Sequence, residues 1–266
     1  MDRLYNSRNL EISRKLQGEY SLDCSNLSQE LPEGTYRLQS KKSSDIERWA
    51  LGWALGSYHF DRYKGTKSVK KTKLFVPQSS KLESIVQSIF LTRDLINTPA
   101  EDMSPADLEN TARGIAKKYN AKINLIIGED LRKKNYPAIH AVGRAVKTTK
   151  QAPRLIDFKW GNTSHPKLTL VGKGVCFDTG GLNIKTTAGM KLMKKDMGGA
   201  ANVLGLAGMI MSHKLPIRLR VLIPAVENNI SGEALRPLDV ITSRSGKTIE
   251  IGNTDAEGRV ILADAL

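Results

Sequence analysis

The chain has little cysteine, few aromatic residues and no long apolar run. Only two of its 266 residues are cysteines, Cys24 and Cys176, and 6% are aromatic. Two cysteines are too few for a disulfide framework, and Cys176 lies in an apolar, strand-like run, so we interpret it as a small buried hydrophobic side chain. A membrane-spanning helix needs about 20 apolar residues, and no run is that long. The amino terminus also lacks the apolar stretch of a signal peptide. We therefore expect a cytoplasmic protein.

Acidic residues are outnumbered, and the net charge is +14. The densest basic segment, Arg62–Lys73, contains no acidic residue. Such a segment could bind nucleic acid or an anionic membrane surface. A solvated loop is the simpler interpretation, because aromatic residues that could stack on bases are scarce. Nucleic-acid binding is kept as an alternative role.

Apolar periodicity predicts strands and helices in alternation, which is typical of an α/β fold with helices on both faces of a sheet. We expect a mixed, mostly parallel sheet flanked by helices, preceded by a small α/β amino-terminal region. A domain boundary is expected near residue 78, giving domains 1–78 and 79–266. The predicted helices start at Asp45 or cover 81–97, 104–119, 129–134 and 197–212; the predicted strands cover 73–77, 122–127, 138–142, 154–160, 168–171 and 218–223, with a hairpin over 240–251.

Four carboxylates and a lysine lie in glycine-rich, otherwise apolar segments of the last third of the chain: Lys173, Asp178, Asp196, Asp255 and Glu257. Carboxylates packed closely repel one another unless cations neutralise them. Two divalent ions would cancel four negative charges. No histidine falls in these segments, so the oxygen-rich ligand set suits Mg²⁺, Mn²⁺ or Zn²⁺. The segments therefore predict a two-metal hydrolytic site.

The expected local structure supports convergence of these segments. The run Leu168-Thr-Leu-Val-Gly-Lys173 reads as a buried strand entering a glycine loop, at the sheet edge where open α/β folds place their sites. Asp196 would begin the next helix, where a negative charge is favoured. Residues 255, 257 and 259 are two apart, so an extended segment would turn all three side chains the same way.

Three blocks closely resemble the leucyl aminopeptidase family of two-metal exopeptidases, peptidase family M17. They are Val171-Gly-Lys-Gly-Val-Cys-Phe-Asp-Thr-Gly-Gly181, Asp196-Met-Gly-Gly-Ala-Ala201 and Asn253-Thr-Asp-Ala-Glu-Gly-Arg259. Segments 58–63, 94–100 and 137–143 are also similar to that family, so the resemblance covers roughly residues 53–266. It implies hydrolysis of the amino-terminal, leucine-like residue of peptide substrates by a cytoplasmic homohexamer.

The resemblance also implies the ligands of two ions, Mn²⁺ or Zn²⁺. Asp178 and Glu257 would bridge both ions. Lys173 and Asp196 would complete one metal site, and Asp255 would complete the other. To bind a metal, the Lys173 amine must be neutral, which requires the charge of the metal itself.

Two further roles follow from the same resemblance. Lys185 matches the lysine that holds the carbonyl oxygen of the substrate and stabilises the oxyanion. Arg259 matches the arginine that holds a bicarbonate ion acting as general base. Family members continue well beyond the last block, so we expect the carboxyl-terminal part of the catalytic domain 79–266 to be missing. A 266-residue chain of this kind is then expected to be weakly stable and weakly active.

Other interpretations of the motifs explain less. Asp178-Thr-Gly180 matches the motif of aspartic proteases, but only one copy exists. Gly172-Lys-Gly174 suggests a phosphate loop, yet neither glycine-rich phosphate-binding pattern is present there. We interpret the four histidines as structural or surface residues, and most methionines as core residues. A non-catalytic, truncated member of the family that binds nucleic acid is the alternative function.

Overall fold

The computed structural model describes residues 3–6, 11–12, 25–39, 43–65, 72–76, 79–146 and 148–266. Cys24 and residues 66–71 of the basic segment lie outside this part of the chain. The chain forms two compact units, Met1–Phe90 and Leu91–Leu266, and each is described by itself. The division falls inside helix α3 (Ser80–Asn97). The domain boundary expected near residue 78 stays a prediction.

The first unit is a small α/β region, as predicted. Its sheet has the strand order β2-β1-β3-β4, and the apolar face of helix α2 supplies much of its core. Trp49 and Trp53 are four residues apart on α2, so they lie on one face, and both pack with Tyr36 and Leu27. The elements are β1 (Arg3–Asn6), β2 (Glu11–Ile12), α1 (Leu27–Glu30), β3 (Gly34–Gln39), α2 (Ser43–Gly56) and β4 (Thr72–Phe75).

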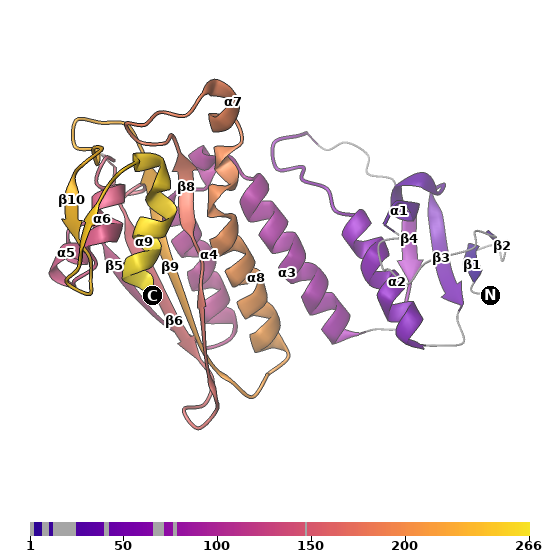
Figure 1. The fold of residues 1–266 in the computed structure, drawn as a ribbon. Helices are drawn as coiled ribbons and strands as arrows, with labels where there is room; N and C mark the ends of the chain where they lie inside the picture. Colours follow the sequence, from indigo (N-terminus) through magenta and orange to yellow (C-terminus); the bar gives the residue numbers. More distant parts are fainter. Residues whose placement is uncertain are drawn as a thin grey trace. The chain divides into compact units, whose positions relative to one another are not determined.

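The second unit is built on a mixed sheet of strand order β5-β6-β9-β7, with β8 also paired to β9 (Figure 1). Strand β6 runs antiparallel to both β5 and β9, whereas β7 and β8 run parallel to β9. Strands β5, β7, β8 and β9 therefore run in the same direction and only β6 of the described strands is reversed, so the sheet is mixed and mostly parallel, as predicted. The strands are β5 (Lys122–Ile127), β6 (Arg154–Trp160), β7 (Lys167–Val171), β8 (Gly174–Asp178) and β9 (Arg218–Asn228).

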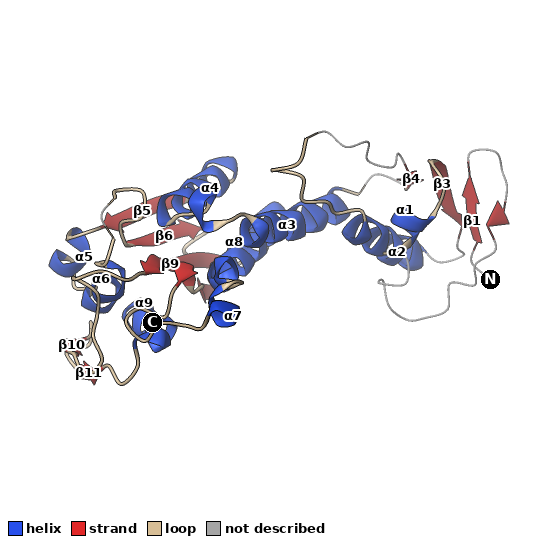
Figure 2. Ribbon diagram, turned by 90° about the horizontal axis from the view of Figure 1, so that it is seen from above, coloured by secondary structure: helices blue, strands red, loops and turns tan. Residues whose placement is uncertain are grey.

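Helices cover both faces of this sheet, as the alternating pattern predicted (Figure 2). On one face, α4 (Pro105–Lys118) and α8 (Gly198–Ser212) pack against Ile156 and Phe158 of β6. On the other, α5 (Asp130–Lys133), α6 (Pro137–Gly143) and α9 (Glu257–Ala265) pack against Leu155. Side chains alternate between faces along a strand, and full burial of each large one stabilises the fold by about 1.5–3 kcal/mol.

The segment 138–142 is a helix, so the predicted strand there is wrong. It lies in α6, which starts at Pro137, a residue well suited to the first helical position. Short apolar runs do not distinguish a buried strand from a buried helix. Tertiary contact decides here: the Asp264 carboxylate of α9 accepts hydrogen bonds from the backbone N–H groups of Ala138 at 2.6 Å and Ile139 at 3.3 Å, which caps the start of α6.

Near the candidate site, strand β9 is longer than the sequence predicted. It continues to Asn228 rather than ending near residue 223. The strand-like run around Cys176 forms strand β8 (Gly174–Asp178), which follows the turn at Gly172 and Lys173. The hairpin of β10 (Val240–Thr242) and β11 (Thr248–Glu250) is antiparallel, as predicted. None of the helices in the described ranges is long and apolar enough to cross a membrane.

Replacing Ser104 tests the predicted start of helix α4. The Ser104 hydroxyl accepts a hydrogen bond from the Asp107 backbone N–H, and the Asp107 carboxylate accepts one from the Ser104 backbone N–H at 3.0 Å. Loss of such a cap costs about 1 kcal/mol. We expect Ser104→Ala to lower the free energy of unfolding by this amount in urea denaturation at pH 7, whereas Ser164→Ala, at an exposed position, should change it little.

Because Asp107 is part of this cap, the effect of Ser104→Ala on the free energy of unfolding should depend on pH. Burial raises the pKa of Asp107, but hydrogen bonds from Ser104 and the charge of Lys150 outweigh it and hold the pKa below its ordinary value of 3.8. A depressed carboxyl pKa stabilises the fold above that ordinary value and loses this effect as the pH falls through the lowered pKa. The difference between Ser104→Ala and the unmodified protein should shrink over that acid range. An unchanged difference would contradict the role of the carboxylate.

Candidate metal centre

Three of the predicted acids meet at the carboxyl end of the sheet. Asp178 ends strand β8, Asp255 lies in the 3₁₀ turn η4 (Thr254–Ala256), and Glu257 is the first residue of α9. One carboxylate oxygen from each lies within 4.8 Å of the other two. Asp178 and Glu257 are 2% and 3% exposed. Like charges this close and this buried repel strongly unless a cation lies among them.

Lys173 brings the fourth acid to the cluster. It lies in the turn between β7 and β8, and its ammonium is 2.8 Å from Glu257 Oε1. It also donates a hydrogen bond of 3.0 Å to Asp196 Oδ1 in the 3₁₀ helix η3 (Met193–Met197). Asp196 therefore lies just before helix α8, close to the helix start that the sequence predicted.

Glycine at two positions makes room for Lys173. A Cβ atom at Gly258 would lie 2.8 Å from Lys173 Cε, and one at Gly199 would lie 2.9 Å from the Lys173 backbone nitrogen. The Lys173 carbonyl accepts a hydrogen bond of 2.9 Å from the Ala200 N–H at the start of α8. Close backbone approach therefore explains why the acidic segments are rich in glycine.

Lys185 lies against the other side of the acidic cluster. Its ammonium is 2.9 Å from Asp178 Oδ2 and is also hydrogen-bonded to Asp255 Oδ1. Its backbone N–H donates to the Thr179 carbonyl at 2.9 Å, which ties the loop after β8 back on itself. Two lysines from different loops thus each pair with two carboxylates of the cluster.

The electrostatics of the cluster are dominated by burial and by these pairs. Burial raises the pKa of Glu257 above its ordinary value, although Lys173 opposes the shift. Burial lowers the pKa of Lys173, but its hydrogen bonds to Glu257 and Asp196 outweigh this and raise it. The pKa of Lys185 is raised in the same way by Asp255 and Asp178. Both lysines are therefore cations in this arrangement, and four carboxylates against two ammonium groups leave a formal charge of −2.

Two carboxylate oxygens of the cluster fit a metal ion. Glu257 Oε2 and Asp196 Oδ2 are buried and accept no hydrogen bond from any group in the described part of the chain. Asp196 Oδ2 does lie 2.9 Å from Lys173 Nζ, but the hydrogen bond of that ammonium goes to Oδ1. Buried polar atoms are nearly always paired in proteins. The remaining negative charge and the unpaired Glu257 Oε2 suit a hard or borderline divalent cation.

The segment that contains Asp255, Glu257 and Arg259 is not extended, so the prediction that these side chains turn the same way is wrong. It forms the turn η4 and the first turn of α9, and residues two apart on a helix do not face each other. The Arg259 side chain is exposed and makes no hydrogen bond or ion pair with the other residues that the structure describes. Asp255 and Glu257 still converge because the helix starts between them.

A buried hydrogen-bond network that the sequence did not predict supports the cluster. Asn228 Nδ2 donates to Asp178 Oδ1 at 2.8 Å and to the Thr254 carbonyl at 3.0 Å. The Thr254 hydroxyl donates to the Gly180 carbonyl and accepts from the Asn183 N–H at 2.9 Å. The available signal was the polar pair Glu227-Asn228 after an apolar run, which was missed because β9 was expected to end earlier.

The expectation that Cys176 is a small buried side chain is confirmed, and His140 is also buried. Cys176 is a free, fully buried cysteine, and burial raises the pKa of its thiol well above the ordinary value. His140 is buried, and its Nε2 is hydrogen-bonded to Glu129 Oε1 at 2.8 Å. Neither residue belongs to the acidic cluster.

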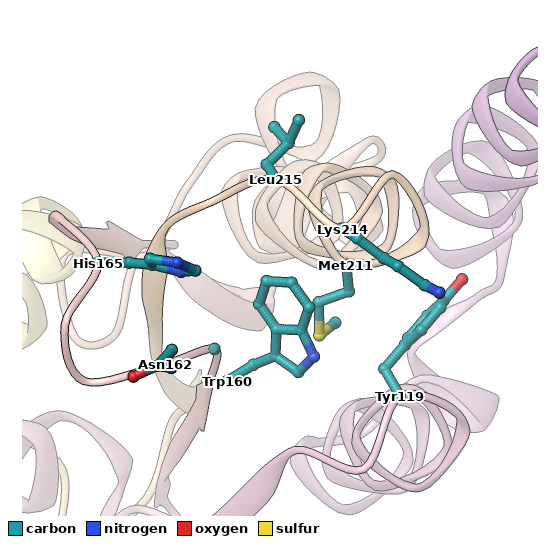
Figure 3. Close-up of a pocket in the computed structure, with 8 residues that line it drawn as sticks. Tyr119, Trp160, Asn162, His165, Met211, Lys214 and Leu215 are labelled. Atoms are coloured by element: carbon teal, nitrogen blue, oxygen red, sulfur yellow. The ribbon is translucent and has the colours of Figure 1, made fainter.

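A separate cavity of about 360 Å³ lies elsewhere in the second unit. Figure 3 shows the Trp160 ring at its centre, with Met211 beside the ring and Tyr119 close to Lys214. None of the predicted site residues lines this cavity, and neither does any carboxylate. Its aromatic walls and single lysine do not make a metal site.

Two family models match the chain. The model described as "Cytosol aminopeptidase family, catalytic domain" matches residues 90–266. The model described as "M17 aminopeptidase, N-terminal domain" matches residues 12–77. Among curated relatives, a probable cytosol aminopeptidase 1 of Shewanella oneidensis is 35% identical over 249 residues, which are 89% of this chain and 49% of that protein.

Solved structures of similar proteins share the fold. A cytosol aminopeptidase from Coxiella burnetii is 49% identical with a TM-score of 0.90, covering 98% of this chain and 59% of that one. The bottromycin maturation enzyme BotP in complex with Mn is 30% identical with a TM-score of 0.82, covering 92% and 55%. The apo leucyl aminopeptidase from Trypanosoma cruzi is 31% identical with a TM-score of 0.81, covering 92% and 50%. The chain spans about half the length of the curated relatives that it matches.

Replacing Thr254 tests the network under the acidic cluster. Thr254 is 2% exposed and its hydroxyl bonds both to Gly180 and to Asn183. Loss of a buried hydrogen-bonding group costs about 1–3 kcal/mol when its partners are left unpaired. We expect Thr254→Val, which keeps the shape of the side chain, to lower the free energy of unfolding by that amount in urea denaturation. Thr242→Val on the exposed face of β10 is the control, and an equal effect of both variants would contradict the network.

Proposed function

The chain belongs to the cytosol aminopeptidase family M17, and on this basis we propose that its protein removes the amino-terminal residue, with a leucine-like preference, from peptides at a centre of two divalent metal ions. The observation that carries the proposal is the meeting of Asp178, Asp255 and Glu257 within 4.8 Å. These acids come from two segments about 75 residues apart in the sequence. Such convergence of buried negative charge has no evident structural benefit, because it costs stability unless a cation is bound.

We assign the ligands from this geometry and from the family resemblance. Asp178 and Glu257, the most buried acids of the cluster, would contact both ions. Lys173 and Asp196 would serve one ion, and Asp255 would serve the other. When bound, such ions lower the pKa of water, polarise the scissile carbonyl and accept the free α-amine of the substrate. The oxygen-rich ligand set suits Mn²⁺ or Zn²⁺, and the similar enzyme BotP has been solved with Mn.

Lys173 would bind a metal only as a neutral amine. In the structure its ammonium pairs with Glu257 and Asp196, which raises its pKa. The proton must therefore leave when a divalent ion takes its place between the same carboxylates, since metal ligands bind in their deprotonated form. Metal binding by this protein should release protons.

Lys185 is suited to hold the carbonyl oxygen of the substrate. Its pKa is raised by Asp255 and Asp178, so its side chain stays positively charged at neutral pH. A fixed positive charge stabilises the oxyanion that develops as the peptide bond is attacked, and such groups contribute about 10²- to 10³-fold to kcat. The loop bond between the Lys185 N–H and the Thr179 carbonyl keeps the lysine close to the cluster.

Arg259 is suited to hold the bicarbonate ion that would act as general base. Its guanidinium has no partner among the described side chains and can therefore bind an anion through two parallel hydrogen bonds. Arg259 lies two residues after Glu257, on the first turn of α9. The bound anion would then take up the proton of the attacking water.

The location, substrate and assembly of the whole protein are proposed from the family resemblance. We propose a cytoplasmic enzyme that acts on peptides and assembles as a homohexamer. The amino-terminal unit and the basic segment that begins at Arg62 leave room for nucleic-acid binding as an additional role. The acidic cluster supports the peptidase function, whereas no arrangement of the described residues points to recognition of bases. The peptidase function is therefore the better-supported one.

Neutralising single acids of the cluster tests the proposed function. We expect Asp255→Asn and Glu257→Gln each to lower the Mn²⁺- or Zn²⁺-dependent hydrolysis of a leucyl chromogenic substrate by more than about 100-fold, beyond the 10- to 100-fold that loss of a supporting partner costs. Removal of the metal with a chelator should have the same effect on the unmodified protein. The control is Glu250→Gln, which removes an exposed acid from β11. Parental rates in both site variants would refute the assignment.

A further inference from the structure

Resting on the proposed function, we propose that Asn228 is a positioning residue for the metal centre. Asn228 ends strand β9 and is 4% exposed. It is not an acid, it lies outside the three sequence blocks, and the one acid of the cluster to which it is hydrogen-bonded is Asp178. Its side chain joins the strand end that carries Asp178 to the turn that carries Asp255.

The side-chain amide uses both of its hydrogens for this purpose. One N–H donates to Asp178 Oδ1 at 2.8 Å and the other to the backbone carbonyl of Thr254 at 3.0 Å. Thr254 directly precedes Asp255 in the turn η4. A single planar group therefore fixes the separation between the end of β8, which carries Asp178, and the turn η4, which carries Asp255.

The strand pairing places Asn228 directly beside Asp178. Asp178 and Asn228 are paired residues of the neighbouring parallel strands β8 and β9. The Asn228 carbonyl accepts hydrogen bonds from the Thr179 N–H at 3.0 Å and the Thr179 hydroxyl at 2.9 Å. On the other side of the amide, a Cβ atom at Gly181 would lie 2.9 Å from Asn228 Oδ1. Backbone on several sides thus holds the amide in one orientation.

The consequence for Asp178 is that its two oxygens have different roles. Oδ1 accepts from Asn228 Nδ2 and from the Gly180 N–H at 2.8 Å. Oδ2 is left to face the cluster, where it lies 2.9 Å from the Lys185 ammonium. Partners that orient a ligating carboxylate typically change metal affinity or activity by about 10- to 100-fold. Asn228 therefore sets which oxygen Asp178 presents to a cation.

The test is calorimetric titration of the protein with Mn²⁺ alone, beside urea denaturation without metal. Asn228→Leu keeps a similar volume but donates no hydrogen bond, and we expect it to raise the Kd for Mn²⁺ by about 10- to 100-fold. Ser243→Ala is the matched control, because it removes a buried hydroxyl bonded to the Lys247 carbonyl in the β10–β11 hairpin. Both variants should lower the free energy of unfolding, but only Asn228→Leu should weaken Mn²⁺ binding.

A second variant covers the case in which Asn228→Leu does not fold. Asn228→Asp has the shape of the amide, cannot donate when ionised, and brings a second carboxylate oxygen against Asp178 Oδ1. We expect it to weaken Mn²⁺ binding as well, although an added negative charge by itself would tighten it. An unchanged or lower Kd in the folded variants would overturn the positioning role and leave the proposed function standing. Absence of Mn²⁺ binding by the unmodified protein would instead overturn the proposed function.

Discussion

The mutual repulsion of buried carboxylates is the constraint on which the rest of this site depends. Asp178, Asp196 and Glu257 are all shielded from water, and Asp255 joins them from the adjacent turn. Water cannot screen charges in such a place, so each carboxylate needs a cation or a hydrogen-bond donor nearby. Lys173 and Lys185 supply two positive charges. Glu257 Oε2, which is buried and accepts no hydrogen bond from the described residues, marks where further positive charge is needed.

The fold meets this constraint by bringing a turn, the end of a strand and the start of a helix to one edge of the sheet. The β7–β8 turn carries Lys173, the end of β8 carries Asp178, and the start of α9 carries Glu257. Parallel pairing of β8 with β9 then sets an amide, Asn228, directly beside Asp178. Glycines at 199 and 258 let the helices approach Lys173 closely. Neighbouring backbone thus lies close to Lys173 and to Asn228, which favours a fixed geometry of the site.

Sequence patterns predicted the elements that carry strong local signals. Helix α4 begins at Ser104-Pro105 because a capping side chain and a helix-compatible proline stand together there. Strands β5 and β6 have the predicted bounds, since each is a compact apolar run. The segment 138–142 was assigned wrongly because its helix is fixed by Asp264, more than a hundred residues later in the chain. No local pattern could contain that information.

For the candidate site, the sequence supplied the residue types and left their geometry open. Charge and glycine content identified Lys173, Asp178, Asp196, Asp255 and Glu257, and the structure brings these residues together. The relation of Arg259 to the acids could not be predicted, because the helix start between Asp255 and Glu257 changes the direction of every later side chain. Asn228 was missed for another reason: strand β9 was expected to end near residue 223, and the strand continues to Asn228.

The central claim is that acids from separate segments form one centre for two divalent cations. Anomalous diffraction at the manganese edge, from crystals of the protein grown with Mn²⁺, tests it most directly. We predict two neighbouring anomalous peaks, both in contact with the carboxylates of Asp178 and Glu257. No peak at these carboxylates, or peaks only at other acids on the surface, would contradict the account.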